Sequence, residues 1–154
     1  MGPAKGGLMK EQKRTFADLC AEFIGKPYSE LGTGPDSYGC LGFCYAFLKA
    51  AGKAVVESEW QYEGYSVGNF MEAWKEDPRK MESVMMKGAE RVGQAVPVKR
   101  KIAGDMLILK TRTGSYFPGI YAGNGNCLAS YSDIGVRVFQ IDNDGITVIK
   151  ARRL

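Results

Sequence analysis

A cysteine stands where the sequence predicts the first turn of an apolar helix, and this placement suits a catalytic nucleophile. Cys40 follows turn-forming residues over 29–38 and precedes a largely apolar run over 41–48. A helix N-terminus carries partial positive charge and unpaired N–H groups, which favour a thiolate and can hold an oxyanion. The predicted chemistry is therefore attack by the Cys40 sulfur on a carbonyl carbon, with the backbone N–H groups of Cys40 and Leu41 near the oxyanion.

The chain contains no histidine, the residue type that ordinarily moves protons near neutral pH. A thiol with a pKa of about 8.5 is mostly protonated at pH 7. Something must accept that proton and later donate one to the leaving group. Free cysteine is also among the most buried residue types, so Cys40 has a second interpretation, as a small apolar side chain under a sheet.

The other cysteines give weaker signals. Cys20, Cys44 and Cys127 form no C-x-x-C pair, and neither a metal nor a cofactor is expected without histidine or paired thiols. Cys40 and Cys44 lie four residues apart on one helix face, where a disulfide would constrain little. We therefore expect free, buried thiols, as in a reducing compartment.

Composition predicts one globular domain. The chain has 154 residues, a hydrophobic fraction of 45% and a net charge of +4. Two basic clusters, 98–101 and 150–153, are interpreted as solvated strand edges, with weak attraction to an anionic polymer as the alternative and no nucleic acid as partner. No segment has the length and apolarity of a signal peptide or a membrane span, which predicts a cytoplasmic protein, or one associated with a phage or a cell envelope by another route.

The first half of the chain predicts helices. Apolar residues at helical spacing indicate a helix over 10–24 and a second one from about 39 to 51. The second helix is apolar nearly all round, which is typical of a central helix covered on both sides. Residues 53–97 are harder to interpret, with short helices indicated within 65–78 and 79–92. Residues 1–9 are expected to be a flexible tail.

The second half predicts strands separated by turn residues. We expect five strands in an antiparallel meander, with a tight hairpin at the GNGN of 123–126. The predicted strands are 104–112, 116–123, 126–132, 135–141 and 145–152. Helices first and strands after predict an α+β domain over 10–154, with the N-terminal helices packed on one sheet of about five strands.

Three stretches of the chain share a pattern with one known family. FIGKPYSELGTGPDSYGCLGFCYAFLKAAG, residues 23–52, is similar to lGxPYxxGGxxPxxfDCSGlvxyvfxxaG, and AGDMLIL to the strand pGDLvff. PGIYAGNGNCLASYSDIGVRV is similar to HVGIYLGNGkfIHAsxxxGVri. Over roughly residues 16–141 the chain thus resembles the NlpC family of bacterial cell-wall cysteine peptidases, in the papain-like superfamily. The resemblance implies a papain-like fold with Cys40 at the nucleophile position.

The same resemblance identifies which family residues are missing. The family's base histidine falls on Phe117, and the second polar position, usually a histidine on the next strand, falls on Ala129. The aspartate before the cysteine is Gly39, and the serine after it is Leu41. The resemblance therefore implies a nucleophile position that has lost the charged and polar partners of the family.

Strand alternation limits which residues could compensate. Phe117 and Tyr121 should share one face, as should Ala129 and Tyr131, while Tyr116 should point to the other face. Tyrosine, with a pKa of about 10, is a poor base at neutral pH. The candidate ligand-contacting residues are Tyr28, Asp36, Ser37, Leu41, Tyr116 and Tyr131.

Two of these candidates have structural alternatives. The family places its tyrosine at the position of Tyr28 beside the cysteine, but a Pro-Tyr turn packed on the central helix would use the same residues. Asp36 and Ser37 are expected to cap the helix rather than to touch a ligand.

Three functions follow from these observations. The favoured one is a non-catalytic descendant that keeps an apolar cleft for a peptidoglycan stem peptide or a protein partner. The second is an active cysteine hydrolase or acyltransferase that uses Cys40 with a base other than histidine. The third is different chemistry on the same scaffold, for instance a redox reaction between Cys40 and Cys44.

Overall fold

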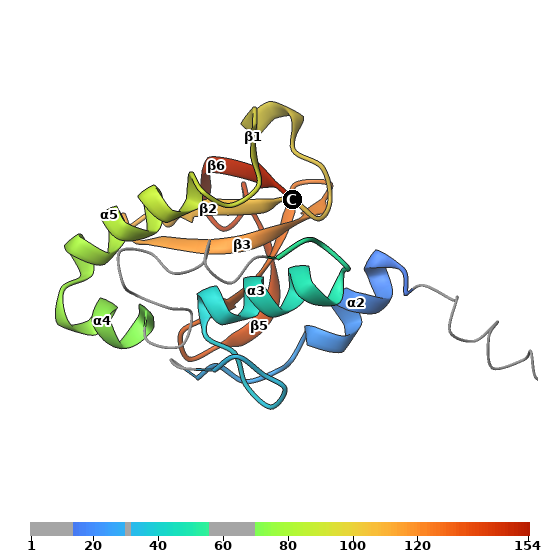
Figure 1. Ribbon diagram of the computed structural model, residues 1–154, viewed down its shortest axis with the longest axis horizontal. Coiled ribbons are helices and arrows are strands. Elements are labelled where there is room, and N and C mark those ends of the chain that lie inside the picture. Colours follow the sequence, from blue (N-terminus) through green and yellow to red (C-terminus); the bar gives the residue numbers. More distant parts are fainter. Residues whose placement is uncertain (1–13, 30–31, 56–69) are drawn as a thin grey trace, which may run out of the picture.

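The computed structural model describes residues 14–29, 32–55 and 70–154, in which helices precede an antiparallel sheet (Figure 1). The helices are α2 (Phe16–Phe23), α3 (Cys40–Ala50), α4 (Phe70–Glu76) and α5 (Pro78–Ala89). The strands are β1 (Gln94–Val96), β2 (Met106–Lys110), β3 (Tyr116–Gly123), β4 (Asn126–Tyr131), β5 (Gly135–Gln140) and β6 (Thr147–Arg153), with a 3-10 turn η2 (Val98–Arg100) after β1. The predicted α+β order is confirmed. None of the helices in these ranges is long and apolar enough to cross a membrane.

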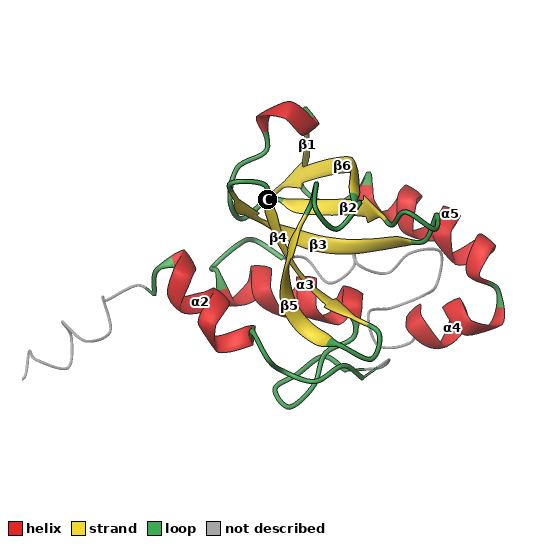
Figure 2. Ribbon diagram, turned by 180° about the vertical axis from the view of Figure 1, so that it is seen from behind, coloured by secondary structure: helices red, strands yellow, loops and turns green. Residues whose placement is uncertain are grey.

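The sheet differs from the predicted meander at both ends. Its strand order is β1-β6-β2-β3-β4-β5, so β2 to β5 form the meander but β6 returns to pair with β2 (Figure 2). The short strand β1, which was not predicted, adds a sixth strand beside β6. The outer edge of β5 is already occupied, because Gly25 N–H donates to Val136 C=O at 2.8 Å and Val136 N–H donates to Lys26 C=O at 2.9 Å.

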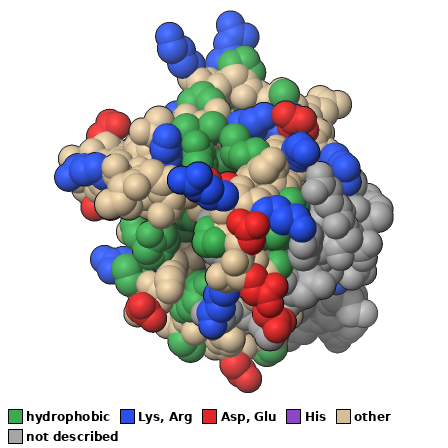
Figure 3. All heavy atoms as spheres, turned by 90° about the vertical axis from the view of Figure 1, so that its left-hand side faces the viewer, with side chains coloured by type: hydrophobic (Ala, Val, Ile, Leu, Met, Phe, Trp, Pro, Cys, Tyr) green, Lys and Arg blue, Asp and Glu red, His purple; other side chains and the backbone are tan. Residues whose placement is uncertain are grey.

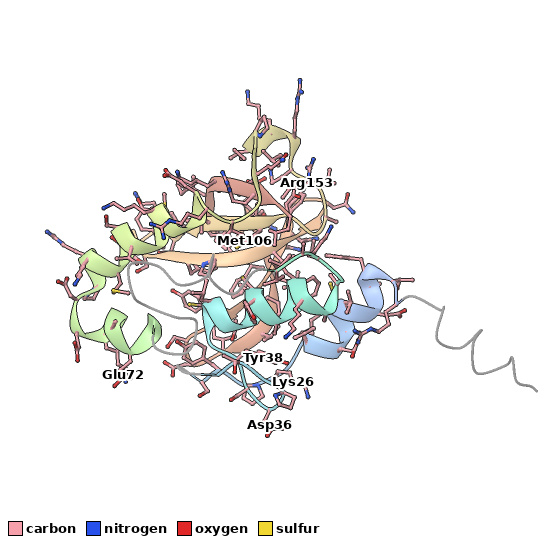
Figure 4. All side chains as sticks on the ribbon, in the orientation of Figure 1. Lys26, Asp36, Tyr38, Glu72, Met106 and Arg153 are labelled. Atoms are coloured by element: carbon pink, nitrogen blue, oxygen red, sulfur yellow. The ribbon has the colours of Figure 1, made fainter. Side chains whose placement is uncertain are left out.

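The central helix α3 packs along one face of the sheet (Figure 1). The predicted all-round apolar surface is confirmed, since seven of its residues are buried: Cys40, Leu41, Gly42, Phe43, Cys44, Phe47 and Leu48. Met106, labelled in Figure 4, belongs to the same cluster from the sheet side, as do Ile120 and Leu128.

The opposite face of the sheet carries a second apolar cluster. Strand alternation sends Phe117, Cys127 and Ala129 there, whereas the neighbouring Ile120 and Leu128 face α3. Tyr121 and Tyr131 pack against this second cluster, while Tyr116 packs on the α3 side. The predicted sharing of faces is therefore confirmed.

The two short helices of the middle region are α4 and α5. The Asp77 side chain accepts the Lys80 N–H at 3.2 Å and caps α5, with Pro78 in its first turn. The expected flexible tail, residues 1–9, lies outside the described residues.

The two basic clusters of the sequence meet at the β1–β6 end of the sheet. There Lys150 pairs with Glu90 at 2.9 Å, and the Arg152 guanidinium donates to the carbonyls of Glu90, Val92 and Gly93. On the face shown in Figure 3, lysines and arginines alternate with acidic side chains. Much of the basic charge of 150–153 is thus used within the fold.

Asp105, at the entry to β2, is a buried carboxylate that pairs with the partly exposed Arg153. Its carboxylate is 3% exposed and accepts two bonds of 2.9 Å from the Arg153 guanidinium (Figure 4) and one of 2.8 Å from the Ile102 N–H. A buried carboxylate with three donors ties the start of β2 to the end of β6.

We expect the substitution Asp105→Asn to destabilise the fold by at least about 2 kcal/mol, because it removes the charge that these donors satisfy. The melting temperature should fall by about 4–8 °C, measured by circular dichroism. Asp142→Asn, which changes an exposed carboxylate, is the control and should leave the melting temperature nearly unchanged. Equal melting temperatures for the two variants would refute this assignment.

Candidate functional site

Cys40 is the first residue of α3, as predicted, and its side chain is 8% exposed. The preceding loop packs closely on the first turn of α3: Gly39 N–H donates to Gly32 C=O at 2.8 Å, and a Cβ added at Gly42 would lie 2.2 Å from the same oxygen. The Ser130 hydroxyl, fully buried on β4, donates to Tyr38 C=O at 2.6 Å. Glycine is required at position 42, because the Gly32 carbonyl oxygen leaves no room for a Cβ there.

The predicted capping of α3 by Asp36 or Ser37 is wrong. The N-cap residue is Gly39, which has no side chain to cap with. Tyr38 N–H donates to Pro27 C=O at 3.0 Å and Tyr38 C=O accepts the Ser29 N–H at 3.2 Å. This extended pairing places Asp36 and Ser37 upstream of the helix start.

The Cys40 thiol is protonated at neutral pH. Burial raises its pKa to about 12, although the backbone N–H groups of Leu41 and of Cys40 itself stabilise the thiolate and act in the opposite direction. The predicted effect of the helix N-terminus is thus present but smaller than desolvation. A pKa of about 12 leaves roughly one thiolate in 10⁵ molecules at pH 7.

Phe117 and Ala129 hold the positions where sequence resemblance places polar residues. The Phe117 side chain is 4% exposed and its ring makes edge contacts with Tyr131 at 5.2 Å and Phe139 at 6.2 Å between centroids. Ala129 is fully buried in the same cluster. Neither side chain can accept a proton, so this part of the sheet offers apolar contact instead.

The aromatic rings line a pocket of about 230 Å³ on this face, here called the aromatic pocket. It is lined by Thr111, Phe117, Tyr131, Arg137, Phe139, Asp144 and Ile146. Cys40 is not among the lining residues. The pocket therefore includes Phe117, where the sequence resemblance places a base, but it is not built around the sulfur.

A match between most of the sequence and one protein-family model decides the family of this chain. Residues 25–150 match the family model described as NlpC/P60. The chain belongs to the NlpC/P60 family. No curated protein sequence matches it.

Solved structures agree with this membership at the level of the fold. NlpC2 from Trichomonas vaginalis has a TM-score of 0.58 at 19% identity, covering 90% of this chain and 45% of its own. An NlpC/P60 family protein from Bacillus cereus has a TM-score of 0.58 at 20% identity, covering 92% of this chain and 41% of its own. This chain thus spans less than half of either protein.

A third structure is matched over its whole length. The NlpC/p60 domain of the peptidoglycan hydrolase SagA has a TM-score of 0.55 at 22% identity, and the match covers 92% of this chain and 100% of that domain. Together with the helix and strand order, these neighbours show a papain-like α+β fold of the NlpC/P60 type.

The predicted site residues fall into separate groups. Phe117 and Tyr131 line the aromatic pocket and Ala129 lies in the cluster beneath it. Tyr116 is on the other face, where its ring lies 5.3 Å from the Lys110 ammonium. The Leu41 side chain is 1% exposed in the core, so only its N–H group remains available for the predicted role.

The remaining candidates lie in the loop before α3. Tyr28 is half-buried and its backbone forms a bridge with Tyr38, while Asp36 is exposed and Ser37 is half-buried. Two hollows of about 360 and 450 Å³ beside this loop share Phe23, Tyr38 and Ala50.

Arg137 and Phe139 were missed as site residues. Both belong to a predicted strand, 135–141, and pair with Ala129 and Cys127 in the β4–β5 register. Alternation from Tyr131 across the hairpin would have placed them on the pocket face. The turn residues Asp144 and Thr111 had no comparable signal, because their position depends on how β6 returns to β2.

None of the four cysteines forms a disulfide; Cys40, Cys44 and Cys127 are buried as expected, whereas Cys20 is partly exposed. Burial raises the pKa of Cys44 well above its usual range, with smaller contributions from Cys40 and Cys127, and raises that of Cys127 to about 12. Across residues 14–29, 32–55 and 70–154, no group of three histidine, cysteine or acidic residues could hold a metal ion.

We expect iodoacetamide to label Cys20 first in the folded protein, since this side chain is partly exposed, and to label Cys40 slowly from pH 7 to pH 9. Peptide mapping by mass spectrometry distinguishes the four thiols. Urea-unfolded protein, the control, should be labelled at all four. Fast labelling of Cys40 at pH 7 in the folded protein would show that its sulfur is an accessible thiolate.

We expect alkaline pH to destabilise the fold through the same thiols. The folded pKa of Cys40 is raised to about 12, so above the unfolded pKa only the unfolded state releases this proton, and stability falls as pH rises from about 9 to 12. Each fully shifted thiol contributes about 1.4 kcal/mol per pH unit in this window.

Urea unfolding in reductant at pH 8, 9, 10 and 11 measures this slope. Cys40→Ala should have a shallower pH dependence than the wild-type protein. Cys20→Ala is the matched control and should change the slope less, because Cys20 is partly exposed. Parallel slopes for Cys40→Ala and wild type would argue against a buried, protonated thiol.

Proposed function

We propose that this NlpC/P60 domain binds a peptide in the aromatic pocket and does not cleave it by cysteine–histidine chemistry. The observation that carries the proposal is the state of the nucleophile position: the Cys40 thiol is buried with a pKa raised to about 12. The position of the family's base is Phe117, and the chain contains no histidine.

The loss of the base is costly for hydrolysis. A positioned general base typically contributes about 10²–10⁴ in rate, and more where base and nucleophile act as a unit. Here the thiolate is also scarce, because desolvation outweighs the N–H groups of Leu41 and Cys40.

The pocket itself supports a binding role. Ligand sites are typically concave and largely apolar, with a few polar groups that fix orientation. The aromatic rings and Ile146 form such a floor, and Thr111, Arg137 and Asp144 supply polar groups. The SagA domain belongs to a peptidoglycan hydrolase, which supports a cell-wall stem peptide as the ligand class.

The test separates binding from cleavage. Cell-wall tetrapeptides are incubated with the protein, and we expect mass spectrometry to find them intact after 24 hours, on the order of 10⁵ s, a time that covers many turnovers of an ordinary enzyme. Titration followed by NMR should nevertheless show binding, equally in wild type and Cys40→Ala. Phe139→Ala, which removes a half-buried ring of the pocket, should weaken binding, whereas Ile102→Ala, at an exposed apolar residue outside it, should not.

Two results would overturn the proposal. Cleavage that disappears in Cys40→Ala would establish the alternative, an active cysteine hydrolase with a base other than histidine. Absence of peptide binding, or binding insensitive to Phe139→Ala, would remove the aromatic pocket as the site and leave a protein partner as the ligand to be sought.

A further inference from the structure

We propose that the aromatic pocket holds the C-terminal residue of its peptide, an apolar residue whose free carboxylate is bound by Arg137. This inference rests on the proposed function and names the part of the peptide that the site recognises. It is carried by the size of the pocket and by two unpaired charges of opposite sign among its lining residues.

The floor of the pocket has room for one apolar side chain. Phe117, Tyr131 and Phe139 stand edge to face, with centroid distances of 5.2 Å, 6.0 Å and 6.2 Å, and Ile146 is 8% exposed beside them. The volume of about 230 Å³ is below the roughly 300–1,000 Å³ of typical small-molecule sites. Edge-to-face rings form a rigid apolar surface that suits a branched or aromatic side chain.

Arg137 is positioned to receive a carboxylate. Its guanidinium carbon lies 5.7 Å from the centroid of the Phe139 ring, so the ring supports the side chain at the pocket. Within the described part of the chain, Arg137 makes no ion pair and no side-chain hydrogen bond. A planar guanidinium with free N–H groups binds a carboxylate in a bidentate manner, which a terminal carboxylate can satisfy.

Asp144 lines the same pocket and can receive the last peptide N–H. Its Oδ2 accepts the Gln140 N–H at 2.8 Å, which fixes the side chain, while no bond to Oδ1 is present among the described residues. Asp144 forms no salt bridge with Arg137. The two charges therefore match the two polar groups of a C-terminal residue, its carboxylate and its backbone N–H.

Other parts of a peptide satisfy only half of this site. An internal apolar residue has no carboxylate for Arg137, and an N-terminal apolar residue offers an ammonium group to Asp144 but no carboxylate to Arg137. Because a C-terminal apolar residue alone offers a partner to both charges, the terminal carboxylate should dominate selection.

The experiment compares two peptides that differ only at the C-terminus. N-acetyl tripeptides ending in Leu, one with a free carboxylate and one amidated, are titrated into the full chain at pH 7 by NMR or calorimetry. We expect the free acid to bind at least about tenfold more tightly, as the loss of a charge-assisted bidentate contact predicts. Added salt should narrow the difference.

Two variants test whether Arg137 causes the preference for the free acid over the amide. Arg137→Gln should bring the two peptides to similar, weak affinity, and because Arg137 is exposed the fold should be retained. Arg91→Gln removes an exposed arginine that does not line the pocket and should preserve the preference. A preference that survives Arg137→Gln would overturn the assignment of the carboxylate site.

The outcomes also separate this inference from the proposed function. Equal affinity of the acid and the amide in the wild-type protein would overturn recognition of the C-terminus and leave peptide binding in place. Failure of both peptides, together with the cell-wall tetrapeptides, to bind would overturn both.

Discussion

The burial of Cys40 at the start of α3 determines the free energy of charging its sulfur. Gly32 approaches so closely that Gly42 can carry no side chain, and the Tyr38 carbonyl is bonded by a buried hydroxyl of β4. A neutral thiol is tolerated in such a place, whereas a thiolate loses its hydration. The N–H groups of the helix end recover part of that loss but not all of it. In a cysteine peptidase an imidazolium offsets the rest, and this chain has no imidazole.

Phe117 and Ala129, at the positions where the sequence resemblance places polar residues, are consistent with a neutral thiol at Cys40. A buried charge on β3 or β4 would itself need a partner, and Phe117 and Ala129 need none. They pack into a second cluster that continues through Cys127 and Ile146 and is covered at one end by the rings around the aromatic pocket. The helix, loop and sheet of the family fold are thus present, and the side chains at these two positions serve packing.

Much of this arrangement could be predicted from local patterns. The all-round apolar run of α3, the GNGN hairpin and the alternation of β3 and β4 each depend on neighbouring residues alone, and each prediction is confirmed. The place of β6 depends on competition for sheet edges, because Gly25 and Lys26 occupy the free edge of β5. The predicted cap of α3 is wrong for a related reason: the backbone of Tyr38 pairs with Pro27 and Ser29, some ten residues away in sequence. Local sequence patterns thus did not predict the contacts between segments that lie far apart in the sequence.

The alternation of side chains along β3 fixes the face on which residue 117 lies. Successive side chains of a strand point to opposite faces, so Phe117 lies on the pocket face and Tyr116 on the α3 face. Phe117 is paired with Leu109 of β2, which belongs to the same cluster. Any side chain at 117 is therefore presented to Tyr131 and Phe139. A histidine there would require a polar surrounding, whereas phenylalanine completes an apolar one. The residue type at position 117 accordingly sets the chemistry of this part of the face without any change in the backbone, and here it is a ring that packs on other rings.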